Sequence, residues 1–172
     1  DGKPFTAADV VFSIDVFLRK THARARSNMA VVQSIREIDP LTVEFKLKQP
    51  FGPFIGIFEP GTAPMIPKHI YEGTDFANNE ANNTPIGTGP FTVTEFRPND
   101  VITMAANENY RDPSKPAFAS LTFKGGGDAT AAGRAVMETG EFDYAWNLQL
   151  APNVIAKMQE GGKGTPVAGF GP

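Results

Sequence analysis

Proline and glycine are spread along almost the whole chain, and they limit the length of every helix and strand in it. The 172 residues include 15 prolines and 17 glycines. Proline has no backbone N–H to donate, and glycine weakens the interior of helices and strands. We therefore expect short helices and strands joined by many turns, in a fold of the α/β class with mixed (α+β) sheets.

The composition is that of a folded protein, and it excludes several classes of protein and partner. Apolar residues make up 41% and charged residues 20% of the chain, which is typical of globular proteins and not of disordered ones. The net charge of −3 provides no attraction to nucleic acid or anionic lipid. The absence of cysteine excludes disulfides and thiolate metal sites. The longest nearly apolar run, residues 51–58, is far shorter than the roughly 18 residues of a membrane span.

The first half of the chain carries signals for a helix and a β-hairpin. Thr6 and Asp9 have the spacing of a capping box, which begins a helix. The cations within residues 19–26 suit the end of that helix better than a nucleic-acid surface, because no aromatic residue lies among them. Residues 34–47 then alternate around an Asp-Pro-Leu-Thr turn, which predicts a hairpin with one solvent-facing side.

Residues 72–85 are rich in asparagine and poor in apolar side chains. Such a passage is typical of a surface connection. We therefore predict a domain boundary near residue 85, with one domain over 1–85 and another over 86–172.

The second half predicts short strands and two helices. Strand–helix–strand order there would permit a right-handed crossover. The expected elements are strands at 91–96, 101–104, 121–123 and 142–146, a helix capped by Asp128 with Gly140 after its end, and a last helix from Ala151 to about Met158.

Few residues in this sequence could carry catalysis or bind a metal. The glycines at 125–127 do not have the spacing of a phosphate-binding loop. His22 and His69 are the only histidines, and neither has a second ligand at a suitable spacing. Glu141 and Asp143 could form an acid and base pair at the start of a strand, although exposed carboxylates at a sheet edge give the same pattern. We predict no catalytic residue, metal site or cofactor.

The only tryptophan, Trp146, stands beside Asn147 where the last predicted strand ends. Ligands of α/β proteins lie at the carboxyl ends of strands. An aromatic ring beside an amide suits an uncharged polar backbone such as that of a peptide. Alternatively, Trp146 fills the core and Asn147 belongs to a turn.

Four short motifs stand in order along the chain. They are DGKPFTAADVVFS at residues 1–13, PIGTGPF at 85–91, NENY at 107–110 and GEFD at 140–143. In the same order, they resemble the D-G-x-P-F-T-A-x-D-V-x-F-S, G-T-G-P-Y/F, N-x-x-Y and G-E-I/F-D segments of a known family. This family is the extracytoplasmic solute-binding proteins of peptide and nickel ABC importers (family 5, dipeptide- and oligopeptide-binding type). Relatives often have Trp after N-x-x-Y, where this chain has Arg111.

The resemblance implies an incomplete periplasmic binding protein-like fold of type II. In that fold two lobes close on the solute, and this chain resembles an internal fragment without the signal peptide. Residues 1–85 would form the accessory small domain, and residues 86–172 part of the first ligand-binding lobe. We interpret Gly87-Thr88-Gly89 as a tight turn that needs positive φ.

The resemblance also implies a function and a site. The chain would belong to a periplasmic, monomeric, non-enzymatic protein that captures a peptide or peptide-like solute and delivers it to the permease subunits of an ABC transporter. Trp146 and Asn147 align with aromatic and amide positions that face the cleft in peptide-binding relatives, and Leu148 is a weaker neighbouring candidate. A nickel-chelate or heme carrier of the same fold is the alternative, and a hydrolase using Glu141 and Asp143 is a distant one.

Overall fold

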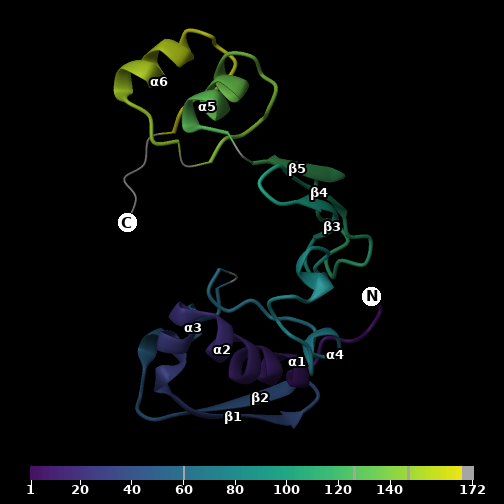
Figure 1. The fold of residues 1–172 in the computed structure, drawn as a ribbon. Coiled ribbons are helices and arrows are strands. Elements are labelled where there is room, and N and C mark those ends of the chain that lie inside the picture. The colour runs from purple at the N-terminus through teal and green to yellow at the C-terminus, as the bar shows by residue number, and fades with distance from the viewer. Residues whose placement is uncertain (60, 126, 147, 168–172) are drawn as a thin grey trace. The chain divides into compact units, whose positions relative to one another are not determined.

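The computed structural model describes residues 1–59, 61–125, 127–146 and 148–167. It divides into two compact units, Asp1–Phe123 and Lys124–Pro172 (Figure 1). Helices and sheets are mixed along the chain, as the sequence predicts. None of the helices within these ranges is long and apolar enough to cross a membrane. The assignment of 1–85 and 86–172 to different domains of a larger protein stays a prediction.

A continuous helix from residue 7 to residue 21 opens the first unit. The carboxylate of Asp9 accepts a hydrogen bond from the Thr6 N–H at 2.8 Å, which confirms the predicted helix start. The middle of the helix has the wider π-helical turn, and both ends are α-helical. The helical segments in this part of the chain are α1 (Ala7–Val11), η1 (Phe12–Leu18), α2 (Arg19–Thr21), α3 (Ala23–Asn28) and η2 (Met29–Val31).

Two antiparallel strands form the predicted hairpin. They are β1 (Val32–Asp39) and β2 (Thr42–Leu47). Ile35 lies opposite Phe45, and exposed and half-buried residues alternate along β2. The hairpin therefore has one face toward the core and one toward solvent. The fully buried members of this core are Ile14, Leu18, Ala25, Met29, Val32 and Ala63.

Two polar side chains of the first helix hold a segment that lies more than 50 residues further along the chain. Asp9 accepts a hydrogen bond from the Lys68 N–H at 2.9 Å. The Ser13 hydroxyl accepts one from the Ile66 N–H at 2.8 Å and donates to the Asp9 carbonyl at 2.6 Å. Asp9 is only 7% exposed and Ser13 is fully buried. This Asp9–Ser13 clamp therefore fixes the chain where it enters the next helix.

The asparagine-rich passage, residues 72–85, lies mostly at the surface, as its composition predicts, and several of its side chains bond to neighbouring residues. The Asn82 amide donates to the Phe76 carbonyl at 2.8 Å and accepts from the Tyr71 hydroxyl at 3.0 Å. The Phe76 ring lies 5.2 Å from the Phe17 ring, edge to face. Asn79 and Asn82 thus bond local backbone carbonyls, while the passage as a whole stays mostly exposed. The remaining helical segments of this unit are η3 (Gly52–Ile57), α4 (Lys68–Tyr71) and η4 (Glu80–Asn82).

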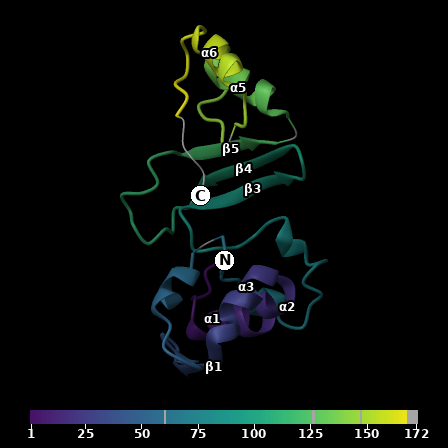
Figure 2. The same ribbon diagram turned by 90° about the vertical axis from the view of Figure 1, so that its left-hand side faces the viewer.

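A three-stranded sheet follows, in the order β3–β4–β5 (Figure 2). Its strands are β3 (Phe91–Arg97), β4 (Val101–Ala106) and β5 (Ser120–Lys124). β3 and β4 are antiparallel, and Asn99 in their connecting turn has a φ of 61°. All three strands were expected from the sequence. The expected positive φ at Gly87 or Gly89 is wrong, because neither glycine has a positive φ.

The described part of the second unit contains two helices, both predicted. They are α5 (Ala129–Met137) and α6 (Pro152–Gln159). The Asp128 carboxylate caps α5 by accepting from the Ala131 N–H at 2.8 Å. Gly140 has a φ of 69°, a value that suits glycine just beyond a helix.

The strand predicted at residues 142–146, and with it the crossover, is wrong for the described part of this unit. The segment has no regular secondary structure, and no strand pairs with it there. Its only backbone hydrogen bond among the described residues runs from the Phe142 N–H to the Ala135 carbonyl at 3.2 Å. Aromatic residues favour a strand only when a neighbouring strand is available for pairing.

The clamp yields a prediction for stability. Asp9→Ala removes the acceptor for two backbone N–H groups, so we expect it to lower the free energy of unfolding by about 2–3 kcal/mol. Asp15→Ala on the same helix is the matched control, because Asp15 is exposed and forms a surface ion pair with Arg19 at 3.0 Å. Its cost should stay below about 0.5 kcal/mol. Urea titrations followed by circular dichroism measure both, and equal losses would contradict the assigned role of Asp9.

The same carboxylate predicts a dependence of stability on pH. Burial, the largest single influence, raises the pKa of Asp9, but hydrogen bonds from Thr6 and Lys68 and the charge of His69 together lower its pKa below the usual value. A lowered pKa in the folded state stabilises the fold above the unfolded pKa of about 4, and this stabilisation is lost as pH falls through the folded value. The stability difference between the wild type and Asp9→Asn should be constant near neutral pH and shrink below about pH 4. A difference that does not change down to pH 2 would show that Asp9 is not ionised in the fold.

Candidate functional site

The residues predicted to bind a solute lie in the second unit, in the irregular segment between α5 and α6. Trp146 is 79% exposed, although it is the largest side chain in the chain. Its ring lies 6.4 Å from that of Tyr144, which is 70% exposed. Asn147, the amide neighbour, lies outside the described residues. The segment therefore presents two adjacent aromatic rings to solvent.

The segment is held in place on both sides of these rings. Before them, the Glu141 N–H donates to the Thr139 hydroxyl at 3.3 Å, and Phe142 is bonded to Ala135 of α5. After them, Leu148 is half-buried against α5, where Gly133 has no side chain. A Cβ at Gly133 would lie 3.4 Å from Leu148 Cδ1 and 3.0 Å from Met158 Sδ. The glycine thus permits a close approach that anchors the exposed rings.

The other chemical candidates have mainly structural partners. His22 Nδ1 accepts from the Ala25 N–H at 3.0 Å and caps α3, and His69 Nε2 lies 2.6 Å from an Asp1 carboxylate oxygen. Glu141 and Asp143 are both exposed. In the described ranges, no group of three or more His, Cys, Asp or Glu side chains could hold a metal ion.

Two sequence motifs that are far apart in the chain meet in the structure. The Asn107 amide of the NENY motif donates to the Gly89 carbonyl at 2.8 Å, and the Asn107 N–H donates to the Pro90 carbonyl at 2.9 Å. This contact joins the GTGP turn to the end of β4. Both motifs therefore have a structural role, as does the motif at residues 1–13, which contains Asp9 and Ser13.

Sequence reasoning missed two parts of the arrangement. Tyr144 was assigned to a strand, and its contact with Trp146 could have been suggested only by their spacing of two. The close packing at Gly133 of α5 carries no local signal, because its neighbours Leu148 and Met158 are distant in sequence.

The chain matches the family model described as bacterial extracellular solute-binding proteins, family 5 Middle, over residues 1–169. The oligopeptide-binding protein AppA of Bacillus subtilis is 34% identical over 149 residues, which are 84% of this chain and 27% of that protein. The structure of this AppA in complex with a nonapeptide has a TM-score of 0.69 and 33% identity, and the match covers 83% of this chain and 29% of that one.

A second solved relative is NikZ from Campylobacter jejuni in complex with Ni(L-His), with a TM-score of 0.70 and 28% identity. That match covers 83% of this chain and 28% of NikZ. The chain thus spans less than a third of the length of these relatives. Because the family model matches nearly every residue and the folds agree, the chain belongs to the bacterial extracellular solute-binding proteins of family 5.

Proposed function

We propose that this chain is part of the solute-binding component of an ABC import system, which captures a peptide or peptide-like solute outside the cytoplasm. The protein then delivers the solute to permease subunits in the membrane. The observation that carries the proposal is the anchored, exposed Trp146 in a chain whose relatives include an oligopeptide-binding protein. We place the protein in the periplasm as a monomer and assign it no enzymatic activity.

The segment at residues 143–146 offers main-chain groups to which a peptide main chain can bond. Residues 143–146 leave their backbone N–H and C=O groups without partners among the described residues. A peptide in extended form can add to such a segment as a strand does, and main-chain bonding of this kind tolerates many side chains. The Trp146 ring would cover the peptide plane, and the Asn147 amide would bond its polar groups.

Leu148 packs against α5 next to this site. Its contact with α5 at Gly133 holds the backbone next to Trp146, so we assign it a positioning role as well as a place at the edge of the site.

Capture requires more than this chain. Solute-binding proteins favour a closed state in which two lobes contact the solute, and the affinity comes from contacts made only on closure. In our proposal, residues 86–172 supply part of one lobe and residues 1–85 the accessory domain. We therefore expect the chain alone to show no measurable peptide affinity by calorimetry, and micromolar binding by it would contradict the role given to the second lobe.

A nickel-chelate carrier of the same fold is the second candidate. The similarity to NikZ, solved with Ni(L-His), favours it. Titration calorimetry of the full-length protein with peptide pools and with nickel–histidine separates the two. Heat from peptides alone supports the proposal, and heat from the chelate alone overturns it.

The site itself is tested by Trp146→Ala in the full-length protein. Loss of an aromatic contact at the centre of an interface costs more than about 1–2 kcal/mol, so peptide affinity should fall roughly tenfold or more. Phe118→Ala is the matched control, because Phe118 is an aromatic residue 68% exposed in the other unit. If Trp146→Ala and the wild type bind peptide with equal affinity, Trp146 does not contribute to the site.

A further inference from the structure

The C-terminal end of α5 joins the segment proposed to bind the solute to the helix before it. The Phe142 N–H donates to the Ala135 carbonyl of α5 at 3.2 Å. The Glu141 N–H donates to the Thr139 hydroxyl at 3.3 Å, and this hydroxyl donates in turn to the Ala135 carbonyl at 3.2 Å. Residues 139–142 are therefore attached to the last turn of the helix.

Lys163, in the loop that follows α6, bonds to the same end of α5. Its ammonium group donates to the Thr139 carbonyl at 2.9 Å, and its backbone N–H donates to the Met137 carbonyl at 3.3 Å. The last carbonyls of a helix have no partner within the helix, and a positive charge beside them suits the helix dipole. Thr139 therefore links the loop after α6 to the start of the solute segment.

Two glycines allow the loop to approach this closely. A Cβ on Gly161 would lie 2.7 Å from the Met137 carbonyl oxygen, nearer than real Cβ atoms come. A Cβ on Gly140 would lie 3.1 Å from Lys163 Cδ. Gly140 is the first residue of the GEFD motif, so the motif that begins the solute segment also leaves space for the Lys163 side chain.

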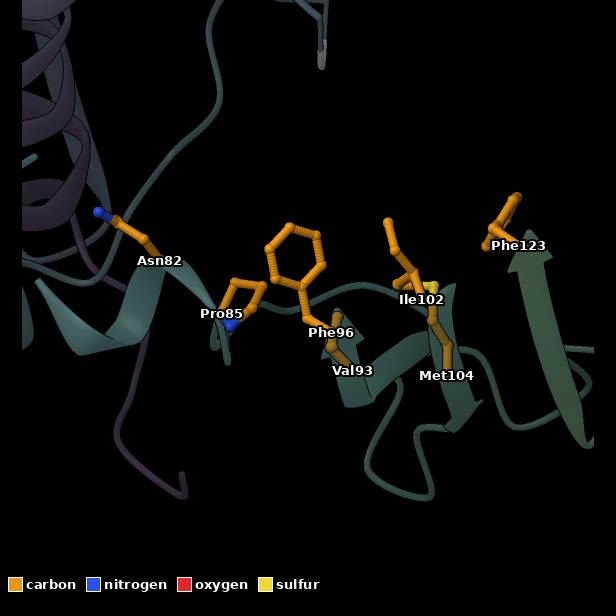
Figure 3. A pocket seen from close by; sticks show the side chains of 7 residues that line it. All are labelled: Asn82, Pro85, Val93, Phe96, Ile102, Met104 and Phe123. Atoms are coloured by element: carbon orange, nitrogen blue, oxygen red, sulfur yellow. The ribbon is translucent and has the colours of Figure 1, made fainter. Parts of the chain in front are cut away.

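The apolar groove in the first unit is a poorer candidate for holding a peptide main chain. It has a volume of about 400 Å³ (Figure 3). Among its described lining residues, Asn82 alone has a polar side chain. Both ends of that amide are bonded, Oδ1 to the Tyr71 hydroxyl and Nδ2 to the Phe76 carbonyl. Because solute sites need polar groups that orient the ligand, the segment at residues 143–146 is the better candidate.

We propose that Lys163 is a positioning residue of the solute site, which holds residues 140–146 in the conformation that binds the solute. The inference rests on the proposed function, in which this segment meets the solute. A segment that is ordered before binding loses less conformational freedom on binding. The apparent affinity also falls in proportion to the fraction of the protein whose site has the binding conformation. Loss of the Lys163 contact should therefore weaken binding, although the contacts proposed for Trp146 and its backbone are unchanged.

Three variants of the full-length protein test this role. Lys163→Met removes the ammonium group but keeps an unbranched side chain, and Lys163→Arg keeps a cationic donor. Lys157→Met is the matched control, because Lys157 is an exposed lysine on α6 of the same unit. Three quantities are measured for each variant: amide hydrogen exchange of residues 139–146 without solute, the urea midpoint, and the affinity for whichever probe the wild type binds, a peptide or nickel–histidine.

We expect Lys163→Met to exchange roughly three to ten times faster at residues 139–146 and to bind the probe more weakly by a similar factor. Its urea midpoint should not change, because Lys163 is exposed. Lys163→Arg should restore most of the protection and affinity, and Lys157→Met should match the wild type in all three measurements. If the wild type binds neither probe, the proposed function fails, whereas the exchange measurement still decides whether Lys163 holds the segment.

Three results would overturn the proposal. Equal exchange of residues 139–146 in Lys163→Met and the wild type would show that the contact does not hold the segment. Faster exchange with unchanged affinity would show that the held conformation does not matter for the solute. A lower urea midpoint with faster exchange throughout the protein would show a general contribution to stability and no specific one to the site.

Discussion

The buried carboxylate of Asp9 joins parts of the first unit that are far apart in the sequence. It bonds the Thr6 N–H at the start of the first helix and the Lys68 N–H at the start of α4. Ser13, one turn further along, bonds the Ile66 backbone. The segment so fixed continues into Tyr71, whose hydroxyl bonds Asn82 in the asparagine-rich passage. The passage is therefore linked to the buried charge of Asp9 through α4, and to the first helix through the contact of the Phe76 and Phe17 rings.

Local structure in this chain was largely predictable, because its signals are short-range. The capping box at Thr6 and Asp9, the turn at 39–42 and the Asp128 cap each act over a few residues, and the structure contains all of them. The contacts of Asp9 with Lys68 and of Asn107 with Gly89 were not predictable in the same way. They join residues whose separation in the sequence has no periodic pattern.

The absence of the strand predicted at residues 142–146 of the described chain has a physical explanation that bears on function. The aromatic pattern of Phe142, Tyr144 and Trp146 is that of a strand, but within the described part of the second unit no strand lies beside it. Among the described residues, the backbone groups of residues 143–146 have no partner and the rings of Tyr144 and Trp146 are exposed, and in our account they meet an extended peptide. The candidate site was predictable from the family resemblance. The close approach at Gly133 that anchors it was not, because the residues that meet there are 15 or more positions apart in the sequence.

A crystal structure of the full-length protein with a bound peptide tests the central claim most directly. The account predicts an extended peptide whose main chain bonds the backbone next to Trp146, with the indole ring in van der Waals contact with it. A peptide bound elsewhere, with Trp146 packed into the protein core, would contradict the account.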